Sequence, residues 1–126
     1  MWQFDGVIPE LPVSDVDTAL EYYRDVLGFS VEGRHVDESG TVVFGSVLCG
    51  GANLYFSRSD SPHDVCRCWI HANDVDSLAH FAGERGARIT ENVEDKPWGY
   101  RQFTVRDPDG HQLTFFQFGE GAAQPA

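Results

Sequence analysis

The chain is poor in positive charge. Its 126 residues include nine basic side chains, of which Lys96 is the only lysine, against twenty acidic ones, so the net charge is −11. Contacts to phosphate groups require a basic surface, and we therefore expect no binding to nucleic acid. A cationic ligand would be attracted to such a chain, although acidic side chains can also serve solubility alone.

Cysteines and long apolar runs are scarce as well. The three cysteines are Cys49, Cys66 and Cys68, an odd number in a chain whose first residues lack the basic start and apolar stretch of a signal peptide. This composition indicates reduced thiols in a cytoplasmic protein. No apolar run approaches the ~20 residues of a membrane span, so no membrane association is expected.

The chain does contain an internal repeat. Asp-Val-Asp-Thr at 15–18 returns as Asp-Val-Asp-Ser at 74–77, and the same offset of 59 positions pairs Phe44 with Phe103. Repetition at a constant offset over most of a chain predicts two copies of one structural unit. A chain of this kind is expected to build its site where the copies meet.

Each copy has the pattern of one strand, one helix and three further strands. Helix starts are predicted at Ser14, with Asp17 three residues later, and at Asn73, with Asp76 three residues later. Short apolar or alternating stretches bounded by turn residues predict the strands. The expected strands are 7–13, 30–36, 41–48 and 52–57 in the first copy, and 66–72, 88–93, 101–106 and 112–118 in the second.

These units predict the fold class. We expect an α+β protein in which two tandem βαβββ modules, 1–57 and 66–118, form a curved mixed sheet with a central cleft. Together they make a single domain, 1–118, with a polar linker at 58–65. Residues 119–126 lack any periodicity and are expected to form a disordered tail.

Two sequence motifs resemble those of a known superfamily. One is the helical segment 19–29, Ala-Leu-Glu-Tyr-Tyr-Arg-Asp-Val-Leu-Gly-Phe; the other is a Pro-Trp-Gly turn at 97–99 followed by Arg-Asp-Pro-Asp-Gly at 106–110. Both resemble the vicinal oxygen chelate superfamily, which includes glyoxalase I, extradiol dioxygenases, and fosfomycin- and bleomycin-resistance proteins. The second motif is most similar to the bleomycin-resistance branch. The resemblance implies the glyoxalase/bleomycin resistance fold and a homodimer with grooves formed across two chains.

The resemblance also identifies four positions that hold a metal ion in metal-dependent relatives. Carried onto this chain, they are Ile8, Tyr55, Arg67 and Thr114, and the offset of 59 pairs the first with the third and the second with the fourth. None is a His, Glu, Asp or Gln, and arginine would repel a cation. We therefore expect no bound metal, no cofactor and no catalytic residue.

Without metal ligands, the predicted cleft is an aromatic groove. Strand alternation places one set of side chains toward it, and the resemblance adds Trp98, for which a hydrophobic plug at a turn is the alternative. The candidate ligand-binding residues are Asn53, Tyr55, Arg67, Trp69, His71, Trp98, Thr114 and Phe116. Phe44 and Phe103 are expected in the core, and the histidines other than His71 (His35, His63, His80 and His111) at exposed positions.

The predicted function follows from this groove. We expect a metal-free protein that sequesters a bleomycin-like or other aromatic or cationic antibiotic, with acidic side chains at 37–38 and 91–95 flanking the groove. One alternative is an enzyme of the glyoxalase/dioxygenase family, a lyase, isomerase or oxygenase acting on an unknown small molecule through His71, Tyr55 or Arg67. Another is a binding module for a metabolite.

Overall fold

The computed structural model describes residues 1–61 and 63–119. Its elements follow the predicted order of strand, helix and three strands in each copy. They are β1 (Glu10–Val13), α1 (Val16–Asp25), β2 (Ser30–Val36), β3 (Val42–Cys49), β4 (Ala52–Arg58), β5 (Arg67–His71), α2 (Val75–Glu84), β6 (Arg88–Asp95), β7 (Tyr100–Arg106) and β8 (Gln112–Phe118). The βαβββ pattern is therefore confirmed in both copies.

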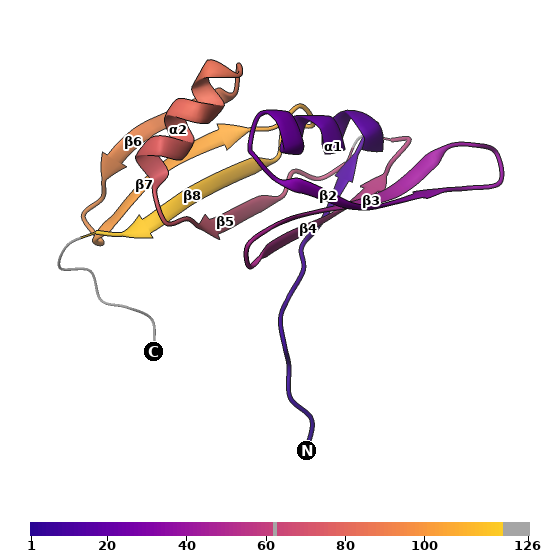
Figure 1. Ribbon diagram of the computed structural model, residues 1–126, viewed down its shortest axis with the longest axis horizontal. Coiled ribbons are helices and arrows are strands. Elements are labelled where there is room, and N and C mark those ends of the chain that lie inside the picture. The colour runs from indigo at the N-terminus through magenta and orange to yellow at the C-terminus, as the bar shows by residue number, and fades with distance from the viewer. Residues whose placement is uncertain (62, 120–126) are drawn as a thin grey trace.

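The strands form two mixed four-stranded sheets. Their orders are β1-β4-β3-β2 and β5-β8-β7-β6, in which β1 and β5 run parallel to their neighbours and the other pairs are antiparallel. Both helices lie on the same side of the sheets, and the N-terminal segment leaves on the opposite side (Figure 1). The side of each sheet without a helix is called its helix-free face below.

The first strand is shorter than the sequence predicted. It was expected to begin at Val7, but it begins at Glu10. The last ladder bond runs from Tyr55 N to Pro9 O at 3.0 Å, and Pro9 has no N–H with which to continue the ladder. Residues 1–9 therefore form an extended arm outside the sheet (Figure 1).

The helix caps lie one residue later than predicted. Asp15 and Asp74, not Ser14 and Asn73, are the N-cap residues, and their carboxylates accept the backbone N–H groups of the residues three positions on, at 2.8 and 3.1 Å. Aspartate caps a helix as well as serine or asparagine does, so the motif alone did not separate the two. The backbone N–H of Ser14 instead donates to Asp109 of the second copy.

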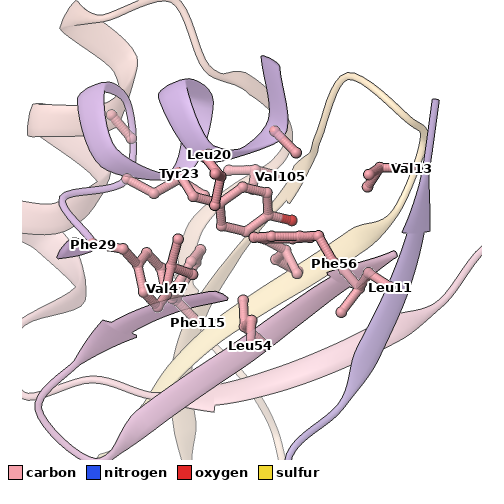
Figure 2. Packing of buried hydrophobic residues seen from close by; sticks show 14 of the residues in the cluster. Leu11, Val13, Leu20, Tyr23, Phe29, Val47, Leu54, Phe56, Val105 and Phe115 are labelled. Carbon is pink, nitrogen blue, oxygen red and sulfur yellow. The ribbon is translucent and has the colours of Figure 1, made fainter. Parts of the chain in front are cut away.

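The hydrophobic core is shared by both copies. Tyr23 of α1 packs against Phe56 of β4, with ring centroids 4.7 Å apart, and both are fully buried. Val105 and Phe115 of the second copy belong to the same cluster (Figure 2). The packing thus unites the copies on the helix-covered side of the sheets.

The equivalence of Phe44 and Phe103 is wrong in three dimensions. Phe103 is fully buried, whereas Phe44 is only partly buried and lies outside the core cluster. The loop between the paired residues Leu48 and Asn53 is one residue shorter than that between Arg106 and Gln112. A shift of one residue turns a strand's side chains to the opposite face, so Phe44 points to the helix-free face.

Candidate functional site

Side-chain alternation brings several of the predicted site residues to the helix-free face of the second sheet. Cys68 and Ile70 of β5 pack against the core, so Arg67, Trp69 and His71 between them face the other way. All three are exposed. Strand β5 therefore offers a cation, an indole and an imidazole to solvent on one surface.

Aromatic rings form a continuous patch on this face. Phe116 of β8 lies at its centre, with ring centroids 5.8 Å from Trp69, 5.2 Å from His71 and 5.1 Å from Tyr100. The ring of Phe118 lies 4.8 Å from His71 and 5.4 Å from Tyr100. These five residues are called the aromatic patch. Tyr100 was missed in the sequence, although it pairs with Phe118 at the start of the strand after the Pro-Trp-Gly turn.

Trp98 stands beside the patch. Its indole Nε1 donates to Gln102 Oε1 at 3.2 Å, and Gln102 pairs with Phe116 in the ladder. Gln102 is buried, but the Trp98 side chain remains 54% exposed, and the Lys96 ammonium lies 5.7 Å from the centroid of its ring. A half-exposed indole held in place by a hydrogen bond has a free face on which a ligand can stack.

Thr114 lies beneath this surface. It is 2% exposed, and its hydroxyl is 3.0 Å from that of Thr104, which donates to the Glu91 carboxylate at 3.0 Å. Because the Thr104 hydroxyl donates its hydrogen bond to Glu91, it accepts the hydrogen bond that the Thr114 hydroxyl donates. This chain of bonds fixes the floor of the second sheet between β8 and β6.

Tyr55 and Asn53 lie on the first sheet, away from the aromatic patch. The Tyr55 ring packs edge-on against Phe44 at 5.0 Å. The Asn53 Oδ1 atom is buried and has no hydrogen-bond partner within the described residues. The structure thus groups Trp69, His71 and Phe116 in one patch, and the two first-sheet candidates are not part of that patch.

A cleft of about 800 Å³ opens between the two copies. Its walls come from the turn between β3 and β4, from β5, and from the beginning of α2, with Val7 and Pro9 of the arm also contributing. Of the predicted site residues, Asn53, Trp69 and His71 line it. The volume is in the range of small-molecule sites.

The opposite junction between the copies is closed by the turn at 107–111. The Asp107 carboxylate accepts from the hydroxyl of Tyr23 at 2.7 Å, and Asp109 accepts from the backbone of Ser14 at 2.8 Å. We call this turn the clamp. It fastens the second copy to the start of α1 in the first.

His111 completes the clamp and corrects a prediction. It was expected to be exposed, but it is fully buried. Its Nδ1 accepts from Cys66 N at 2.9 Å, so the proton is on Nε2, which donates to Pro12 O at 2.6 Å. Its ring also stacks on His63 of the linker, with centroids 5.2 Å apart.

The cleft is the repeat counterpart of the clamp. Moving by 59 positions takes Pro12 to His71, and takes His111 back to Ala52. Both of these counterparts line the cleft. The second copy has Asp109 and His111 at this turn. The first copy has Gly50, which has no side chain, and Ala52, whose methyl group is too short to cross the junction. The cleft therefore exists because the turn of the first copy is short and almost without side chains.

The four positions implied for a metal ion do not fit one. Ile8 has no donor atom, Arg67 carries a fixed positive charge, and the Thr114 hydroxyl is engaged with Thr104. No cluster of three or more His, Cys, Asp or Glu side chains suited to a metal occurs in residues 1–61 and 63–119.

Most of the acidic side chains expected to flank the groove are engaged locally. Glu94 pairs with Lys96, and Asp95 pairs with Arg101 at 3.1 Å. The Asp37 carboxylate accepts from Ser39 and Thr41 within its own hairpin turn, and these bonds lower its pKa. These carboxylates therefore stabilise turns and ion pairs and are not free to attract a cation to the groove.

Burial raises the pKa of several side chains near the clamp. It raises the pKa of Tyr22 to about 12, with a further contribution from the charge of Asp107. Burial likewise raises the pKa of the Cys68 and Cys66 thiols, so these cysteines are poor nucleophiles. Neither thiol is a candidate for covalent catalysis.

The fold and the site define a duplicated βαβββ protein with a cleft between its copies and an aromatic patch on the helix-free face. The chain matches the Glyoxalase/Bleomycin resistance protein/Dioxygenase superfamily over residues 7–115, and it belongs to that family. The resemblance seen in the sequence is confirmed.

Individual relatives support the same placement. The chain is 30% identical to a bleomycin resistance protein of Geobacillus stearothermophilus, over 87% of this chain and 94% of that one. It is similar in structure to TioX from Micromonospora sp. ML1, with a TM-score of 0.81, 28% identity, and coverage of 91% and 99% of the two chains. The bleomycin-binding protein of Streptomyces verticillus, solved with copper(II)-bleomycin, gives a TM-score of 0.73 at 29% identity and covers 95% and 100%.

In the part of the chain that the structure describes, no helix has the length and apolar character needed to cross a membrane.

Proposed function

We propose that the protein binds and sequesters an aromatic antibiotic, bleomycin or a similar planar molecule, without metal and without chemical turnover. The aromatic patch carries this proposal. It presents stacked rings on an open sheet surface, and such rings bind flat molecules through dispersion and stacking. The similarity to bleomycin resistance and bleomycin-binding proteins supports the same class of ligand.

The metal-free part of the proposal rests on residue identity. Ile8, Tyr55, Arg67 and Thr114 supply one hydroxyl that is already hydrogen-bonded, one phenol and one cation, a set unsuited to a divalent ion. We propose that the protein acts in the cytoplasm, where binding alone withdraws the drug from its target.

An enzyme of the same family is the second candidate. It would act through His71, Tyr55 or Arg67. His71 and Arg67 lie on the same face of β5, but four residues along a strand place their backbones about 14 Å apart. Tyr55, the third group considered, lies on the first sheet against Phe44. Because these groups do not converge, sequestration is the better-supported function.

We also propose that the working unit is a homodimer. The arm at 1–9 exposes apolar side chains, with Trp2 at 80%, Phe4 at 86% and Val7 at 92%. Such surface is costly in water, and a cleft of about 800 Å³ with a mainly apolar lining lies at its base. In a dimer, the arm of a second copy would fill this cleft, and the apolar side chains of that arm would be covered by the cleft walls.

The dimer is tested by light scattering. A chain lacking residues 1–8 should be monomeric at concentrations where the full chain is a dimer. Replacing Trp2 and Phe4 with serine should have the same effect if apolar contacts are the cause. A full-length chain that is monomeric at high concentration would disprove the dimer.

The binding function is tested by calorimetry with metal-free bleomycin, alongside elemental analysis of the purified protein. We expect a dissociation constant well below about 1 mM, equivalent to more than about 4 kcal/mol of binding free energy. Stoichiometric zinc, nickel or iron would contradict the metal-free proposal. Weaker binding of bleomycin would restrict the function to another aromatic ligand.

A further inference from the structure

One row of the second sheet carries three arginines. Arg67 of β5 pairs with Gln112 of β8, Gln112 pairs with Arg106 of β7, and Arg106 pairs with Arg88 of β6. Paired residues on neighbouring strands project to the same face of a sheet. Since Arg67 lies two residues from Trp69 on β5, these arginines share the helix-free face with the aromatic patch. We call them the arginine row.

The arginine row has no acidic partner in a strongly acidic protein. Within residues 1–61 and 63–119, no carboxylate lies within 4.0 Å of the guanidinium nitrogens of Arg67, Arg88 or Arg106. By contrast, Arg34 and Arg101 each hold an aspartate at 2.7 to 2.8 Å. With twenty acids and nine bases, a row of unpaired arginines is not expected from composition.

The side chains in this row are partly preorganised. Arg106 is partly buried and donates one guanidinium N–H to Gly110 O at 2.8 Å, which anchors it while its other donors stay available. Gln112, between two of the arginines, adds an amide donor and is also partly buried. Arg67 and Arg88, at either side, are exposed.

The fold itself does not require these arginines. In the first sheet, Asn53 takes the place of Gln112, and the residues that follow it across the sheet are Leu48 and Ser30. All three are uncharged, and that sheet forms the same ladders. The positive charge is thus a property of the second copy only.

We propose that the arginine row binds an anionic group of the ligand, a carboxylate, a sulfate or sulfonate, or a phosphate, while its ring stacks on the aromatic patch. This rests on the proposed function and adds a preference to it: among the aromatic molecules that stack on the patch, those that also carry an oxyanion bind more tightly. Guanidinium groups bind oxyanions through paired N–H donors, and their charge does not titrate.

The spacing of the sheet sets the size of this ligand. Residues two apart on a strand are separated by roughly 7 Å, so the arginine row lies about 7 Å from Trp69 and about 14 Å from His71 and Phe116. A ligand with an oxyanion one ring length from its planar system fits the shorter spacing. Stacking over the centre of the patch requires a longer link.

The test uses three probes that share one ring system. Calorimetry at low salt compares 2-naphthoate, 2-naphthylmethanol and 2-naphthylmethylammonium. We expect the carboxylate to bind about tenfold more tightly than the ammonium, and this preference to shrink at high salt because exposed charges are screened. Arg67→Gln, on the same strand as Trp69, should remove most of the preference, whereas Arg88→Gln, three strands away, should remove less; both should leave binding of the neutral probe unchanged.

Matched controls separate this effect from net charge and from the proposed function. Arg24→Gln removes a charge of the same kind on α1, where Arg24 pairs with Asp25, and should leave the preference intact. Equal binding of the three probes, or tighter binding of the ammonium, overturns the arginine-row proposal and leaves the aromatic site standing. If bleomycin binds and none of the naphthalene probes does, the arginine-row proposal fails alone. If no probe and no bleomycin binds, both fail.

Discussion

The hydroxyl of Tyr23 donates to the Asp107 carboxylate at 2.7 Å across the junction of the two copies. Tyr23 is fully buried, and Asp107 is 6% exposed. The second carboxylate oxygen accepts from the backbone N–H groups of Asp109 and His111. One buried carboxylate therefore both shapes the clamp and fastens it to α1.

Replacing Tyr23 with phenylalanine should lower the free energy of unfolding by about 1.5–3 kcal/mol, because the buried carboxylate loses a charge-assisted hydrogen bond. Tyr22→Phe is a matched control, since the Tyr22 hydroxyl is buried without a partner in the described residues. Removing it should be neutral or stabilising. Urea unfolding at pH 7 measures both, and equal losses in the two variants would contradict the assigned hydrogen bond.

Stability should fall at alkaline pH. Burial raises the pKa of Tyr22 from 10.0 to about 12 and raises that of Tyr23 well above 10.0. Between pH 10 and pH 12 the unfolded chain releases these protons while the folded chain keeps them, so the unfolded state gains in stability. The urea midpoint should therefore decrease across this window. The double variant with phenylalanine at both positions should show a smaller decrease from its own value at pH 9.

Gly45 should tolerate no side chain. A β-carbon at this position of β3 would lie 2.9 Å from Val16 Cγ1 and 3.0 Å from Leu20 Cδ2, both on α1. We expect Gly45→Ala to destabilise the fold by about 1–3 kcal/mol, because the side chains of Val16 and Leu20 must shift in a packed core or α1 must move away from the sheet. Gly51→Ala is the control, since that position has open space around it. A thermal melt that ranks the two variants equally would contradict the close packing of α1.

Trp98 should contribute to ligand binding through its ring. Trp98→Ala is expected to weaken binding of an aromatic ligand by about 1 kcal/mol, and Trp98→Phe by less, because a ring is retained. Calorimetry of the same ligand with both variants gives the comparison, and urea unfolding shows whether the fold is affected. Unchanged affinity together with lower stability would assign Trp98 to the turn instead of the site.

The sequence predicted the helices and strands well because the repeat and its turns are local signals. Its errors come from small differences between the copies. The connection from Leu48 to Asn53 is one residue shorter than that from Arg106 to Gln112, and this difference turns Phe44 away from the core that Phe103 occupies. The offset of 59, taken without a gap, could not reveal a shift that only the pairing of strands defines.

The site was predictable only in part. Alternation along β5 and β8 correctly grouped Trp69, His71 and Phe116 on one surface. The burial of His111 depends on the backbone of Pro12, 99 positions away, and no local pattern records such a contact. The repeat did contain one indication. It aligns His111 with Ala52, and a position at which the two copies carry such different residues is a place where their structural roles differ.

The short turn after β3 also makes the cleft sensitive to insertion. The cleft lies where that turn carries Gly50 and Gly51, and its other walls come from strands, from the start of α2 and from the N-terminal arm. An insertion of a few residues bearing side chains would fill it without altering a single wall residue. The length of this turn alone can therefore open or close the cleft, while the sheets and the clamp stay as they are.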